Sequence, residues 1–238
     1  MRRLILIMLC SLSLFSLEAQ KNNQGAKKIN IRDIFLMLPE KAVDNRWSVE
    51  ERKKLLTHVG VSAEGQEWIE PYVEVCDERN GYLRAYLSYP DPTLEVCYWN
   101  LKDGRKLVGV NNAFGYSDLK FYIYDRGRLR EDRSLAPKVS EVKVEDFYET
   151  SQLTPKQRAN LTDVFKHRLV FLFKLPQKGT SIEMYVGARE QDAEYDTMFD
   201  DLGLRDLVDT KYVVFRWVNE RWVKEVKRIP REDWTKHF

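Results

Sequence analysis

Two acidic residues on predicted strands are the first candidates for chemistry. Glu95 lies in the run 94–99 and Glu183 in the run 181–186. Two carboxyl groups about 5 to 9 Å apart in a cleft can hydrolyse a glycosidic bond. A carboxylate-dependent hydrolase is therefore one function to consider, and it requires the fold to bring Glu95 and Glu183 together.

Metal and cofactor chemistry finds no support in the sequence. The histidines His58, His167 and His237 are far apart and fit no zinc pattern such as HExxH. The chain also has no G-x-S-x-G elbow, phosphate-binding glycine loop or dinucleotide fingerprint. We therefore name no catalytic residue, metal ligand or cofactor, and the sequence favours a protein that is not an enzyme, although catalytic groups often meet only in the fold.

An acidic segment resembles a calcium loop in part. Asp192, Glu194 and Asp196 alternate along it and offer carboxylate oxygens. Thr197, however, stands where such a loop needs glycine, and Gly203 where it needs glutamate. We interpret the segment as a solvated loop between strands.

Aromatic residues are the feature of the sequence that most favours a ligand-binding function. If residues 219–220 form a two-residue turn, Trp217 and Trp222 lie directly opposite each other on two strands. Buried, the pair belongs to the core, which is the default for aromatic residues in strands. Exposed beside Trp99 or Tyr98, the rings could stack on a sugar or contact a protein.

A train of short strands between residues 72 and 125 must position these groups. Asn80-Gly81, Asp103-Gly104 and Arg126-Gly127 follow alternating runs, and each pair is suited to a tight hairpin turn. Short loops join neighbouring strands in antiparallel order. The pattern predicts an α+β fold in which antiparallel meander sheets are packed by short helices.

The strand at residues 94–99 has one apolar and one mixed face. Leu94, Val96 and Tyr98 point one way, whereas Glu95, Cys97 and Trp99 point the other. Antiparallel sheets commonly bury one face and expose the other. We expect helices on the apolar face and solvent on the mixed one.

Two helix starts resemble each other. Ser48 with Glu51, and Thr154 with Gln157, each form a capping-box pattern, and an arginine follows at the next position. Strands follow both. The pattern allows two similar helix-helix-sheet halves, residues 30–135 and 136–238, or one continuous domain with a chance similarity.

The N-terminus has the pattern of a secretory signal peptide. Basic residues follow Met1, an apolar run covers residues 4–17, and Ala19 precedes the expected cut. We predict a signal peptide at residues 1–19, a polar linker at 20–29, and an exported protein of the periplasm or the extracellular space. No later stretch is long and apolar enough to span a membrane.

Loss of Cys10 with this leader leaves Cys76 and Cys97. An even pair in an oxidising compartment indicates one disulfide, here between strands that we expect to be neighbours. Two unpaired buried thiols are the alternative, because strand neighbours must face each other in the correct register.

The charge balance argues against nucleic acid as a partner. The chain has 39 basic and 37 acidic residues, and removal of the leader changes these to 37 and 36, a formal net charge of +1. Nucleic-acid binding needs clustered lysine and arginine. Nothing in the sequence indicates the oligomeric state.

Four scattered segments resemble a known family. They are the leader end at Ala19-Gln20, residues 35–39, Asn45-Arg46, and the late strand at 212–217. Together they resemble an uncharacterised family of small exported proteins, a domain of unknown function, from Bacteroides-type bacteria. The resemblance implies export and an α+β fold, but no activity and no catalytic residue.

The leading hypothesis is an exported, non-catalytic binding or scaffolding module of the bacterial cell envelope. Its partner would be an envelope protein or a glycan, contacted through a sheet face. The alternative is the carboxylate-dependent hydrolase, acting on envelope glycans.

Overall fold

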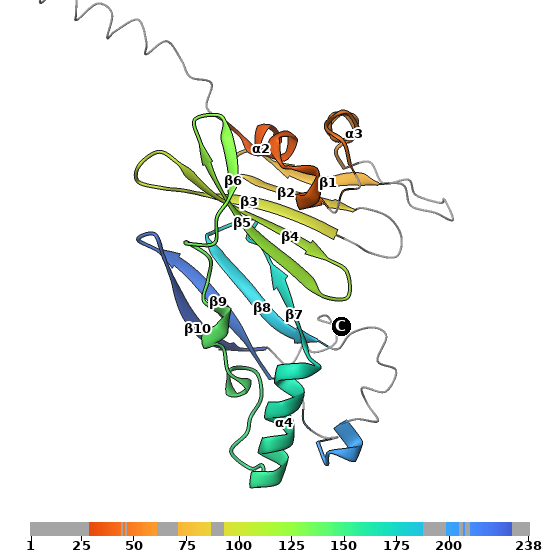
Figure 1. The fold of residues 1–238 in the computed structure, drawn as a ribbon, viewed down its shortest axis with the longest axis vertical. Coiled ribbons are helices and arrows are strands. Elements are labelled where there is room, and N and C mark those ends of the chain that lie inside the picture. Colours follow the sequence, from red (N-terminus) through yellow and green to blue (C-terminus); the bar gives the residue numbers. More distant parts are fainter. Residues whose placement is uncertain are drawn as a thin grey trace, which may run out of the picture. The chain divides into compact units, whose positions relative to one another are not determined.

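The fold is that of a computed structural model in which the chain divides into two units, Met1–Asn30 and Ile31–Phe238. All described helices and strands belong to the second unit (Figure 1). The predicted signal peptide, residues 1–19, and the linker up to residue 28 lie outside the described residues. The structure describes residues 29–43, 45, 47–60, 71–86, 93–187, 199–204, 207 and 210–229.

Short helices open the second unit. Helix α2 (Ile31–Met37) ends just before Pro39, and the 3₁₀ turn η1 (Glu40–Val43) follows. Helix α3 (Val49–Leu55) begins at the predicted capping box, in which the amide of Glu51 donates to Ser48 Oγ and the amide of Ser48 donates to Glu51 Oε2.

The first sheet is a meander of six antiparallel strands in sequence order, as predicted. Each strand pairs with its neighbours in the chain, so local turns determine the topology. The strands are β1 (Tyr72–Asp77), β2 (Tyr82–Tyr86), β3 (Thr93–Asn100), β4 (Lys106–Ala113), β5 (Ser117–Asp125) and β6 (Arg128–Glu131).

Two of the three predicted turns are longer than expected. Asp77 pairs with Tyr82, so Asn80-Gly81 ends a four-residue loop, and Asn100 pairs with Lys106 around Asp103-Gly104. The backbone amide and side-chain amide of Asn80 both donate to the Asp77 carboxylate, which favours the longer loop. Arg126-Gly127 is a two-residue turn with positive φ at both residues, as predicted.

The second part of the unit repeats the order of helices and then sheet. The turns η2 (Val139–Glu141) and η3 (Val144–Asp146) precede helix α4 (Pro155–His167), which begins at the predicted Thr154 and Gln157 capping box. The sheet that follows has the order β10-β9-β8-β7. Its strands are β7 (Val170–Lys174), β8 (Ser181–Gly187), β9 (Lys211–Val218) and β10 (Arg221–Arg228).

Both faces of the six-stranded sheet are buried, and the expectation of one wet face is wrong. Helix α2 contacts β1, β2 and β3 on the apolar face. On the other face Glu95, Cys97 and Trp99 are 6%, 2% and 4% exposed, because the four-stranded sheet packs there.

One cluster of buried residues joins the two sheets. Trp99, Leu107 and Phe121 contribute from the first sheet, and Ile182 and Phe215 from the second. The α+β class with antiparallel sheets and short helices is therefore confirmed. That residues 30–135 and 136–238 are separate domains stays a prediction. Among the described residues, no helix is long and apolar enough to cross a membrane.

Candidate functional site

The β9–β10 hairpin carries the predicted tryptophan pair. Val218 pairs with Arg221 across a two-residue turn, and Asn219 and Glu220 both have positive φ. Trp217 and Trp222 are therefore cross-strand partners, with ring centroids 4.7 Å apart. The pairing confirms the prediction, and it follows from the turn length alone.

The tryptophan pair packs against two aromatic core residues of the first sheet, Trp99 and Phe121. Trp222 meets Trp99 edge to face at 5.0 Å and lies 6.3 Å from the ring of Phe121. Trp99 itself is a core residue, and its indole N–H donates to the carbonyl of Thr180 at 3.0 Å. Trp217 and Trp222 are partly exposed.

Tyr98 lies elsewhere. It alternates with Trp99 along β3 and so points to the opposite face of the sheet, where the Lys106 ammonium lies 4.1 Å from its ring centroid. Of the aromatic residues considered from the sequence, Trp217 and Trp222 remain as candidates for contact with a ligand.

The segment that connects the two sheets runs beside β10 (Figure 1), to which side-chain hydrogen bonds tie it. Trp222 Nε1 donates to the carbonyl of Leu135 at 2.7 Å. Lys224 Nζ donates to the carbonyl of Glu141 at 3.1 Å and pairs with Asp146 at 2.7 Å. Alternate residues of β10 thus hold the connecting segment against one face of the sheet.

A pocket with a volume of about 310 Å³ lies between this segment and the hairpin. One wall is formed by the connecting segment, and the other by residues of β9, the turn and β10. The lining residues are Ser134, Leu135, Ala136, Lys138, Glu141, Phe215, Trp217, Glu220, Arg221, Trp222 and Lys224.

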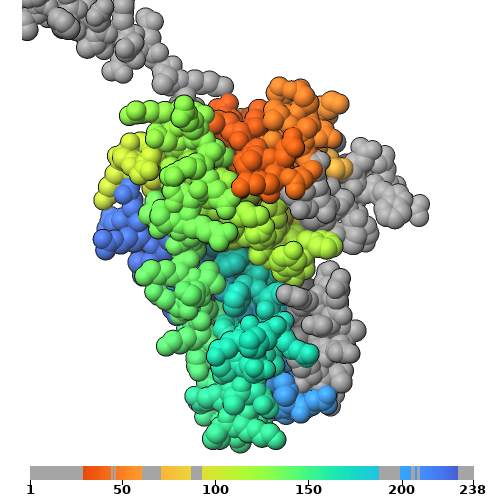
Figure 2. Space-filling model, in the orientation of Figure 1, coloured from red at the N-terminus to blue at the C-terminus, as the bar shows by residue number. Residues whose placement is uncertain are grey.

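Most charged groups of the pocket are already paired. Lys138 pairs with Glu141 at 3.2 Å, and a Glu220 carboxylate oxygen accepts from the backbone amide of Lys102. Figure 2 shows the corresponding closeness of the blue hairpin tip and the yellow β3–β4 loop. The guanidinium of Arg221 has no ion pair or hydrogen bond with any described residue.

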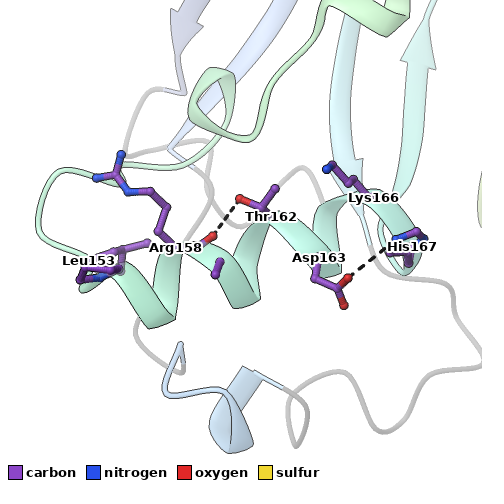
Figure 3. Close-up of a pocket in the computed structure, with 8 residues that line it drawn as sticks. Leu153, Arg158, Thr162, Asp163, Lys166 and His167 are labelled. Carbon is purple, nitrogen blue, oxygen red and sulfur yellow. Dashed lines mark hydrogen bonds and ion pairs between the residues drawn. The ribbon is translucent and has the colours of Figure 1, made fainter.

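A second hollow lies along α4 and is a weaker candidate (Figure 3). Its volume is about 750 Å³, yet the described residues that line it all come from α4, apart from Leu153 just before the helix. Its polar groups face one another along the helix: Thr162 Oγ1 donates to the carbonyl of Arg158 at 2.8 Å, and Asp163 lies 3.7 Å from His167. Among the residues that the structure describes, no second element forms an opposing wall of this hollow.

Glu95 is a structural connection between the sheets. Its carboxylate accepts from Tyr82 Oη at 2.7 Å, from the amide of Leu175 at 3.0 Å and from Asn111 Nδ2 at 3.2 Å. Burial and the neighbouring Glu95 charge raise the pKa of Tyr82 strongly, so its hydroxyl stays protonated and donates.

Glu183 is not brought to Glu95. It alternates with the core residues Ile182 and Met184 on β8, and so points away from the shared core. There it accepts from Tyr185 Oη at 2.8 Å. The two carboxylates therefore do not face one cleft, and the arrangement gives the hydrolase hypothesis no support.

Cys76 and Cys97 are free thiols. They lie on β1 and β3, with β2 between them, so the expectation of neighbouring strands is wrong. Cys76 pairs with Leu83 and Cys97 with Tyr82, which places the two side chains on opposite faces of the sheet. This geometry disfavours the predicted disulfide. Burial raises the pKa of Cys97 well above its ordinary value, which suppresses the reactive thiolate.

The predicted calcium-like residues Asp192, Glu194 and Asp196 lie outside the described residues, as does His237. Within the described part of the chain, no group of three or more His, Cys, Asp or Glu is arranged to hold a metal ion. His167 forms the last turn of α4, where a cation is favourable.

Sequence reasoning missed one whole wall of the tryptophan pocket. Leu135 and Trp222 are 87 residues apart in the chain, and Glu141 and Lys224 are 83 apart. Their contacts depend on how the two sheets pack together. Both alternating sets of β10 side chains contain charged residues, so the sequence of the strand did not indicate which face meets the connecting segment.

Comparisons with known proteins bear on the fold. No protein family matches the chain, and no curated protein does. Among solved structures, the chain is similar to a domain of an uncharacterized protein from Porphyromonas gingivalis W83, with a TM-score of 0.52 and 15% identity. The similarity covers 83% of this chain and 98% of that one. At this identity the likeness shows the fold alone.

Proposed function

We propose that the chain is a non-catalytic binding module that takes one sugar ring of a glycan into the tryptophan pocket. The observation that carries the proposal is that Trp217 and Trp222, partly exposed, line a concave site of about 310 Å³. Ligand pockets commonly measure about 300 to 1,000 Å³, so this one suits a ring-sized group.

The lining chemistry favours a sugar over a flat protein surface. Indole rings offer apolar faces on which the C–H side of a sugar packs. A stable protein interface generally needs about 800 Å² on each partner. A pocket of about 310 Å³ does not provide such an area.

The proposed place of action is the bacterial cell envelope. The N-terminal charged, apolar and small-residue pattern of a signal peptide supports export. The resemblance of residues 35–39 and 212–217 to the family of small exported proteins of Bacteroides-type bacteria supports the same proposal. Scaffolding through the bound glycan is compatible with this role.

A glycan array tests the proposal. Mature protein, residues 20–238, is applied to envelope polysaccharide fragments from Bacteroides-type bacteria, and affinities are then measured by calorimetry. We expect Trp217→Leu to weaken binding by at least tenfold, because the stacking surface is lost. Trp47→Phe is the matched control, since Trp47 is buried against Phe35 in the helical layer.

Two results would contradict the proposal. One is a folded protein that retains no fragment on the array. The other is a Trp217→Leu variant that binds as well as the unaltered chain. A circular dichroism spectrum and thermal melt of each variant establish that it folds.

A further inference from the structure

The charges around the tryptophan pocket indicate what kind of sugar it takes. Five charged side chains line the pocket. Lys138 and Glu141 neutralise each other, and Lys224 is held by Asp146. Glu220 accepts a hydrogen bond from the amide of Lys102 in the neighbouring loop. These groups are engaged before any ligand arrives.

Arg221 differs from the other four. It is exposed, it lines the pocket directly beside Trp222, and its guanidinium has no partner among the described residues. A guanidinium presents a planar set of donors that matches a carboxylate with two parallel hydrogen bonds. An unpaired arginine next to two indole rings therefore complements a ring that bears a carboxylate.

We propose that the pocket selects acidic sugars, with Trp217 and Trp222 packing against the ring and Arg221 binding its carboxylate. This inference rests on the proposed glycan-binding function and names the ligand class. A uronic acid unit has both features, an apolar ring face and a carboxylate attached to the ring. Neutral sugars would use the indole surface alone and bind more weakly.

Arg221 alternates with Trp222 on β10 and so leaves the strand on the opposite face, which places it at the rim of the pocket rather than on its indole wall. Arg221 is the first residue of β10, directly after the Asn219-Glu220 turn, so its backbone is fixed by pairing with Val218. A side chain anchored at the pocket rim loses less freedom on binding than one on a loose loop. Lys227, on the same strand and also exposed, does not line the pocket.

The test compares each acidic sugar with a neutral form of itself. The probes are glucuronate- and galacturonate-containing oligosaccharides together with their methyl esters, which keep the ring and remove the charge. Affinities for both sets are measured with the unaltered mature chain, Arg221→Gln, Trp217→Leu and Lys227→Gln.

We expect the acidic probes to bind about tenfold more tightly than their esters, the gain of a charge-assisted hydrogen bond. Arg221→Gln should remove this preference, because it weakens binding of the acidic probes far more than binding of the esters. Lys227→Gln, which alters net charge equally, should preserve the preference. Added salt should weaken binding of the acidic probes more than that of the esters.

The outcomes separate this inference from the function on which it rests. If acids and esters bind equally, or if Arg221→Gln keeps the preference, while Trp217→Leu abolishes binding, the acidic-sugar inference fails and the glycan pocket stands. If neither probes nor array fragments bind, the glycan function fails and the inference fails with it.

Discussion

Two clusters of chemically capable residues, one on each sheet, differ in whether their groups remain available. Around Glu95, each carboxylate oxygen accepts from a buried donor, and both sheets close over the group. Around Trp217 and Trp222, the rings stay partly exposed and one arginine stays unpaired among the described residues. Polar side chains that are buried and hydrogen-bonded in a core stabilise the fold, whereas side chains that remain exposed in a pocket can bind a ligand.

Glu95 and Glu183 give the sharpest test of this contrast. Glu95→Ala should lower the free energy of unfolding by about 3 kcal/mol, because Tyr82, Asn111 and Leu175 would lose a buried acceptor. Glu183→Ala should cost about 0.5 kcal/mol, since it removes one partly buried hydrogen bond. Urea unfolding of both variants measures the difference, and similar losses would show that Glu95 is not an enclosed structural group.

Arg52 and Arg158, which follow the two capping boxes, also differ in burial. Arg52 is 1% exposed and donates to the carbonyls of Phe35 at 2.5 Å and Leu38 at 2.8 Å, which satisfies the end of α2. Arg158 donates to the carbonyl of Thr150 at 2.8 Å nearer the surface.

Arg52→Met should therefore cost about 2 to 3 kcal/mol in unfolding free energy, since it leaves two carbonyls unsatisfied. Arg158→Met should cost about 1 kcal/mol. The same urea titrations provide the measurement, and a larger loss at Arg158 would contradict the stronger structural role of the buried Arg52.

The stability of the chain at high pH tests whether Tyr122 is buried on the helical side of the first sheet. The Tyr122 side chain is buried there, and desolvation raises its pKa to about 12 from an ordinary value of 10. The folded chain then holds this proton more tightly than the unfolded chain, so stability is intact below pH 10 and falls as the pH rises toward 12. The loss due to Tyr122 should be about 2 kcal/mol.

Tyr122→Phe should make the loss of stability above pH 10 shallower, although not flat, because burial also raises the pKa of Tyr82. Urea midpoints between pH 8 and pH 12 would show the change. An unaltered slope in the variant would mean that the hydroxyl of Tyr122 ionises as freely when folded as when unfolded.

Local sequence patterns predicted the elements that depend on neighbouring residues. The Trp217 and Trp222 pairing followed from a two-residue turn, and the starts of α3 and α4 followed from capping boxes. These features involve residues three to five positions apart, so the chain between them specifies the contact.

Contacts between distant segments were beyond sequence reasoning. The bond from the Leu175 amide to Glu95 joins residues 80 apart, and it turns a candidate catalytic group into a structural one. The second buried face of β3 likewise depends on the packing of two sheets, and alternation along one strand does not reveal what covers it. The pocket could not be predicted either, because its two walls come from the β9–β10 hairpin and from the connecting segment, which are distant in the sequence.

We propose that the open tryptophan pocket, and not the enclosed cluster around Glu95, binds a glycan. The most direct measurement follows the indole N–H signals of ¹⁵N-labelled mature protein during titration with the fragments that the array retains. We predict that the signals of Trp217 and Trp222 move with ligand concentration while that of Trp47, in the helical layer, stays in place. Binding that leaves the signals of Trp217 and Trp222 unchanged would contradict the claim.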